Sequence, residues 1–111
     1  MGADQLLATR AVLATQVRDA VRAVPGVARL APGTAAEVAT YFAGGKVVGV
    51  RLVGDTVRVH VVVDRLPAPP VAAQVEAAVL AVLAGAGDPR PVQVVVEDVD
   101  DAAFRALAAG G

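Results

Sequence analysis

The stretch TVRVHVVVDR, residues 56–65, limits the possible folds more than any other part of the chain. Valine stands at every second position from Val57 to Val63, and the positions between them are mainly polar, with Arg58 and His60 among them. Successive side chains of a strand point to opposite faces, so this pattern predicts a strand with one buried face and one wetter face. We therefore expect a sheet that is covered on one side.

Two further runs predict strands. VVGVRLVG, residues 47–54, is expected to pair with residues 56–65 through a tight hairpin turn at Gly54-Asp55. VQVVVEDV, residues 92–99, predicts a last strand. VARL, residues 27–30, fits either a short strand or an extended connector.

Helical spacing predicts a first helix over residues 4–24, whose apolar stripe contains Leu6, Leu13, Val17, Val21 and Val24. Thr34 and Glu37 have the spacing of a capping box, so a short second helix is expected over about residues 35–43.

A longer third helix should begin at Pro69-Pro70 and end at Gly85. Its predicted core stripe consists of Val71, Val75, Ala78, Val79 and Val82. Asp100 or Asp101 can cap a short tail helix that contains Phe104 and Leu107.

Together these elements predict an α/β (α+β) domain in the order α-α-β-β-α-β, followed by the short C-terminal helix. We expect a small mixed or antiparallel sheet of three to four strands, with a central β-hairpin and the helices on one face. A length of 111 residues suits a single domain over residues 1–111. With 56% hydrophobic but only 3% aromatic residues, its core must consist mainly of valine, leucine and alanine.

Composition also bears on function. Ten basic residues oppose eleven acidic ones, so the net charge of −1 gives no general reason to bind nucleic acid. The absence of cysteine excludes disulfides, thiolate metal sites and cysteine nucleophiles. The N-terminus lacks the pattern of a secretory signal, and no uninterrupted apolar run approaches the ~20 residues of a membrane span. A cytoplasmic protein without a transmembrane segment is the expectation.

His60 is the single histidine and the first residue to consider for catalysis. A general base needs a partner within hydrogen-bond reach, and Asp64 lies about 13 Å farther along an extended strand. We therefore expect His60 to be a surface or partly covered residue of the wetter sheet face. An enzyme or ligand-binding subunit that uses His60 and Asp64 is the weakest hypothesis, and no catalytic, cofactor or metal residues are predicted.

The segment GGKVVG, residues 44–49, invites a phosphate-binding reading. It lacks the Ser or Thr of a Walker motif, and a strand follows it where that motif needs a helix. It is loosely similar to the Gly-x-x-Gly loop of KH domains, although one residue too many separates Gly45 from Gly49. A KH-like nucleic-acid module with contacts at Lys46, Arg51 and Arg58 is thus the alternative function.

The outer side of the third helix is unusual because it is apolar. Leu80 points away from the core stripe and is surrounded by Ala73, Ala77 and Ala84. A helix that packs on a sheet is normally polar on its far side. Alanine is also simply a good helix former, so the pattern leaves two readings open. Either the alanines only favour the helix, or this side is a contact surface for another chain.

Five segments resemble the alkaline shock protein family, the envelope stress response proteins of Gram-positive bacteria. They are VPGVARLAPG, the valine-rich pair VVGVRLVG and TVRVHVVVDR, the proline-led helix LPAPPVAAQVEAAVLAVL, and the last strand PVQVVVEDVD. The resemblance covers roughly residues 10–100. TAAEVATYFAGGK, residues 34–46, departs from the family's pattern.

The resemblance implies a non-enzymatic scaffold or interaction protein without cofactors. It implies a cytoplasmic location, association with the membrane through a partner such as a membrane-anchored relative, and a role in cell-envelope homeostasis. A protein partner or self-association is the expected interaction, and no small-molecule substrate is evident.

Overall fold

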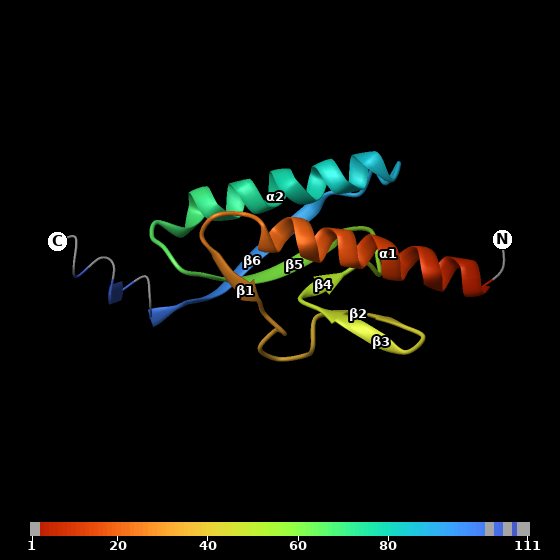
Figure 1. Cartoon of the computed structure of the whole chain (residues 1–111), viewed down its shortest axis with the longest axis horizontal. Helices are drawn as coiled ribbons and strands as arrows, with labels where there is room; N and C mark the ends of the chain where they lie inside the picture. Colours follow the sequence, from red (N-terminus) through yellow and green to blue (C-terminus); the bar gives the residue numbers. More distant parts are fainter. Residues whose placement is uncertain (1–2, 102–103, 106–107, 109–111) are drawn as a thin grey trace.

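The computed structural model describes residues 3–101, 104–105 and 108, and the side chains from residue 9 onward among them. The elements are α1 (Ala3–Arg22), β1 (Val27–Leu30), β2 (Ala39–Phe42), β3 (Gly45–Val48), β4 (Val50–Arg51), β5 (Val57–Val63), α2 (Ala68–Gly85) and β6 (Val92–Val99). The predicted α+β class is confirmed, because the described residues form two long helices and a mixed sheet (Figure 1).

β5 is the central strand of the sheet. Along one edge it pairs with the parallel strand β6, from Val57↔Val92 to Val63↔Val99. Its other edge is shared by two short antiparallel strands, β4 opposite residues 58–59 and β1 opposite residues 61–63. VARL is therefore a strand.

α1 and α2 contact each other and cover one face of this sheet (Figure 1). The four odd-numbered valines of β5 are fully buried beneath them, as the alternation predicts. α1 contributes Ala14, Val17, Val21 and partly buried Leu13, whereas the side chain of Leu6 lies outside the described part. Valine and leucine thus fill the core almost without aromatic residues.

The predicted second helix over residues 35–43 is wrong. Residues 39–42 form β2, which pairs with β3 in a separate two-stranded sheet. Thr40, Tyr41 and Phe42 are residue types that favour strands, and Gly44 adopts a φ of +88° in the turn to β3. The capping pattern of Thr34 and Glu37 was a local signal that strand pairing overrides.

A hydrogen bond joins this small sheet to the main one, because the buried Thr40 hydroxyl donates to the carbonyl of Val50 at 2.6 Å. Gly49, with a φ of +88°, divides the predicted strand 47–54 into β3 and β4. Its N–H donates to Val38 and its carbonyl accepts from His60 N–H. Gly49 is thus the corner at which the chain leaves one sheet and enters the other.

The central hairpin is confirmed, with a wider loop than expected. Arg51 pairs with Arg58, which is the register of a turn centred on Gly54-Asp55. The ladder ends at that pair, however, so residues 52–56 form an open loop between β4 and β5.

α2 and β6 lie close to their predicted positions. Val71, Val75, Val79 and Leu83 are the buried residues of α2, so Leu83 belongs to the stripe and Val82 is only partly buried. In the tail, Asp101, Phe104, Arg105 and Ala108 are helical, and Leu107 lies outside the described residues.

Candidate functional site: the open face of the sheet

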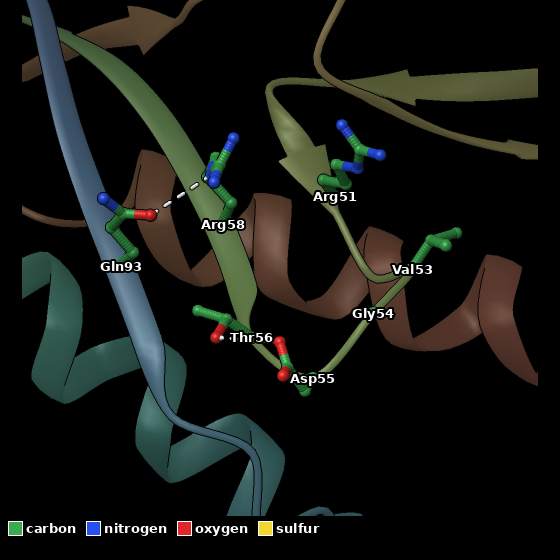
Figure 2. A pocket seen from close by; sticks show the side chains of 7 residues that line it. All are labelled: Arg51, Val53, Gly54, Asp55, Thr56, Arg58 and Gln93. Carbon is green, nitrogen blue, oxygen red and sulfur yellow. Dashed lines mark hydrogen bonds between the residues drawn. The ribbon is translucent and has the colours of Figure 1, made fainter.

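The face of the sheet opposite the helices carries a group of polar side chains. Arg51 on β4 and Arg58 on β5 are directly paired across the strands and are both exposed. Figure 2 shows the two side chains on the same side of the sheet, with the helices behind it. Gln93, which pairs with Arg58 on the other edge, accepts a hydrogen bond from Arg58 Nε at 3.2 Å.

These residues line a surface hollow of about 260 Å³ (Figure 2). Its other walls come from the loop between β4 and β5, with Val53, Gly54, Asp55 and Thr56. Guanidinium, amide and hydroxyl groups therefore meet one acidic side chain in a small space. Such donors suit an anion better than an apolar ligand.

The pairing of Arg51 with Arg58 is unfavourable for the isolated fold. Like charges at directly opposed positions of a sheet destabilise it. Neither guanidinium forms an ion pair with a carboxylate of the described residues. The geometry therefore places two positive charges, neither of them in an ion pair with a described carboxylate, at the rim of one hollow.

His60 lies on the same face and is partly covered there. Its side chain is only 12% exposed, and both ring nitrogens are buried without a hydrogen-bond partner among the described residues. The nearest acidic group is Glu97, whose Oε1 lies 3.6 Å from Nδ1 of His60. The other carboxylate oxygen of Glu97 accepts from the N–H of Gly33 at 3.2 Å, so the segment after β1 reaches this part of the sheet.

The sequence offered little to reveal this pair. His60 and Glu97 meet because β5 and β6 run parallel, with a register irregularity that pairs Val61 with Val96 and Val62 with Asp98. Glu97 occupies the extra position of that irregularity. Asp64, the second residue of the enzyme hypothesis, instead has its Oδ1 atom 3.6 Å from Nε of Arg65.

Lys46 is separated from the two arginines by its position on β3 in the small sheet. Its ammonium lies 2.8 Å from Glu37 Oε2 and 5.8 Å above the ring of Tyr41, whose hydroxyl also donates to Glu37. Hydrogen bonds from Lys46 and then Tyr41 lower the pKa of Glu37, and the bond to Glu37 raises the pKa of Lys46. The three predicted nucleic-acid contacts thus do not form one group.

The predicted contact surface on α2 is exposed as expected. Ala73, Ala77, Leu80 and Ala84 all lie on its outer side, and Leu80 is 42% exposed. With 18 residues and few charges, α2 is also long and apolar enough to cross a membrane, a property that core helices of globular proteins share. In this structure its opposite side packs into the core.

The acidic segment that contains Glu97, Asp98 and Asp100 is distributed among different partners. Asp100 lies 3.3 Å from Nη1 of Arg29, and Asp98 accepts from the N–H of Val99. Within the part of the chain that the structure describes, no three His, Cys, Asp or Glu side chains are grouped to hold a metal ion.

Comparisons with known proteins found no match: no family model fits the chain, and neither a curated protein nor a solved structure matches it. The resemblance to alkaline shock proteins stays a prediction that rests on the five segments given above.

Proposed function

We propose that this protein is a non-catalytic interaction domain that associates with another protein chain through the outer face of α2. The observation that carries the proposal is the exposed apolar side of that helix, defined by Ala73, Ala77, Leu80 and Ala84. Exposed apolar patches on small proteins commonly mark contact surfaces.

The chemistry of this face suits a second copy of the same chain. Gln74 and Glu76 are the polar side chains within the helix, and Glu76, which lies one turn before Leu80 on the same face, is its single charge. An almost uncharged surface needs no oppositely charged partner and can pair with itself across a two-fold axis. Alanine lets two helices approach closely, and Leu80 supplies a side chain to bury.

The energy available is modest. Full burial of a leucine side chain contributes roughly 1.5–3 kcal/mol, and Leu80 is already more than half covered in the monomer. The face therefore suits a weak, concentration-dependent association, or one strengthened by a further partner. It does not suit an obligate dimer held by this helix alone.

The non-catalytic part of the proposal is supported by the position of His60. Its ring nitrogens are enclosed in this conformation, so they cannot reach a proton on a substrate in solution. The wider role that the resemblance implies, a cytoplasmic protein of the envelope stress response held at the membrane by a partner, belongs to this proposal as well.

Two separate substitutions on α2, one at an exposed and one at a buried residue, test the proposal. Leu80→Glu should leave the thermal unfolding transition cooperative and near that of the wild type. In sedimentation experiments over a range of concentrations, it should shift the protein toward the monomer. Val79→Glu, one residue away and fully buried, should instead unfold the domain.

Two results would contradict the proposal. A wild-type protein that stays monomeric at high concentration would exclude self-association through this face. If Leu80→Glu melts as early as Val79→Glu, the outer side of α2 is required for the fold itself.

A further inference from the structure

The hollow between β4, β5 and β6 contains an electrostatic conflict that a ligand would relieve. Cross-strand pairing holds Arg51 beside Arg58, and no carboxylate of the described residues forms an ion pair with either. We propose that this hollow binds a small phosphate-bearing anion between the two guanidinium groups. This site is separate from the α2 face and independent of the proposed self-association.

A second basic hollow, of about 270 Å³ between α1, β1 and β3, provides a comparison. It is lined by more cations, including Arg18, Arg29 and Lys46. Each of these three already has a carboxylate within 3.0, 3.3 and 2.8 Å, respectively. Of the cations there, Arg22 alone lacks an ion pair among the described residues, and an anion would compete with the ion pairs of the other three. At the first hollow, neither Arg51 nor Arg58 has an ion pair with a described carboxylate.

The donor geometry favours phosphate over a single carboxylate. A guanidinium presents its N–H groups as a planar fork that matches two oxygens of one anion. A tetrahedral phosphate has enough oxygens to accept from both arginines, whereas a carboxylate has only two. The Gln93 amide offers a further donor at the wall of the hollow, where the Thr56 hydroxyl donates to Asp55.

The size of the hollow limits the ligand. Its volume of about 260 Å³ is just below the ~300–1,000 Å³ of typical small-molecule sites. That space suits a phosphate group with a small organic substituent. Binding of a long nucleic acid would need an extended basic surface, but Lys46 lies on the other sheet and is engaged with Glu37.

Asp55 gives the proposal an internal test. Its carboxylate lines the same hollow, where its negative charge opposes an anion. Asp55→Asn should therefore strengthen phosphate binding, while Arg51→Gln and Arg58→Gln should each weaken it by about tenfold, the effect of losing one charged hydrogen-bonding group. Arg65→Gln is the matched control, because it removes the same charge from an exposed arginine outside the hollow.

Inorganic phosphate and glycerol 3-phosphate are the probes, titrated at constant ionic strength against the full chain. Amide chemical shifts of Arg58 and Gln93 report binding at the site, and thermal melting reports stability. Arg51→Glu adds a second readout. It converts the like-charged pair into an opposite-charged one, so it should raise the melting temperature in buffer and abolish the stabilisation by phosphate.

Saturable shifts that weaken in both arginine variants, strengthen in Asp55→Asn and persist in Arg65→Gln would support the proposal. It would be overturned if neither probe gives saturable shifts, or if Arg65→Gln weakens binding as much as Arg51→Gln. Binding of a single-stranded oligonucleotide without binding of either small phosphate would also overturn it, in favour of a polymer-binding surface.

Discussion

The guanidinium of Arg90 contacts both carboxylate oxygens of Asp88, with Nη2 2.6 Å from Oδ2 and Nε 3.0 Å from Oδ1. The same guanidinium donates to the carbonyl oxygens of Leu52 and Gly54 in the loop between β4 and β5. Arg90 therefore ties that loop, which forms a wall of the hollow, to the segment that precedes β6. Asp88 holds the guanidinium in place for these contacts.

This arrangement predicts a loss of stability in acid. The hydrogen bonds from Arg90 lower the pKa of Asp88 in the folded state, so its charge stabilises the fold above the usual pKa of 3.8. That contribution disappears as the pH falls below this value. In urea unfolding, the advantage of the wild type over Asp88→Asn should therefore shrink between about pH 5 and about pH 2. If the free energies of unfolding of the two proteins change in parallel with pH, the pair of Asp88 and Arg90 does not contribute to stability.

Gly49 should be nearly irreplaceable. A Cβ atom at this position would lie 2.6 Å from the Cβ of Leu30 and 3.2 Å from the carbonyl oxygen of Ala31, and the φ of +88° is itself unfavourable for alanine. Gly49→Ala should unfold the domain or lower its free energy of unfolding by more than ~3 kcal/mol, as strain and overpacking add together. Denaturant unfolding followed by circular dichroism measures the loss.

Gly44 is the matched control for this substitution. It has the same φ of +88°, but an added Cβ would meet nothing within 4 Å. The free energy of unfolding of Gly44→Ala should therefore fall only by the cost of the positive φ, roughly 1–2 kcal/mol. Equal losses in the two variants would mean that the close approach of Gly49 to Leu30 does not exist in solution.

Val59 provides a test of which sheet face is buried. Its side chain is fully buried, so Val59→Asp would place a carboxylate in an apolar core at a cost of several kcal/mol. This is comparable with the whole stability of a small domain, and the variant should lose its cooperative thermal transition. Val53→Asp, at a 56% exposed loop position, should melt within a few degrees of the wild type. A folded Val59→Asp protein would show that the two faces are reversed.

The features that could be predicted from the sequence are those fixed by residues close to one another along the chain. The boundaries of α2 and β6 follow from continuous patterns of period 3.6 and period 2, and nothing in the tertiary structure competes with them. The pairing of Arg51 with Arg58 also follows from a turn centred on Gly54-Asp55. The two arginines could thus be predicted as neighbours, although the hollow between them could not.

The errors arose where distant segments decide the outcome. Residues 39–42 become a strand because residues 45–48 are available to pair with them, which overrides a capping pattern at Thr34 and Glu37. The contact between His60 and Glu97 was likewise not predicted, because the two residues are distant in sequence and meet through a parallel pairing with an irregular register. Neither the alternation of β5 nor that of β6 contains information about this contact.

The last prediction concerns His60. Two buried ring nitrogens without hydrogen-bond partners are unfavourable, since each has lost its contact with water. His60→Leu removes them and should raise the free energy of unfolding by about 1 kcal/mol, measured by urea denaturation. Glu97→Gln retains an oxygen that can accept from Gly33, so it should change stability by less than ~1 kcal/mol. The double variant His60→Leu/Glu97→Gln measures the coupling between the two side chains. If its change in the free energy of unfolding equals the sum of the two single changes, the 3.6 Å contact does not contribute to stability. If His60→Leu instead lowers the free energy of unfolding strongly, and adding Glu97→Gln restores part of that loss, the two side chains form an ion pair that supports the fold.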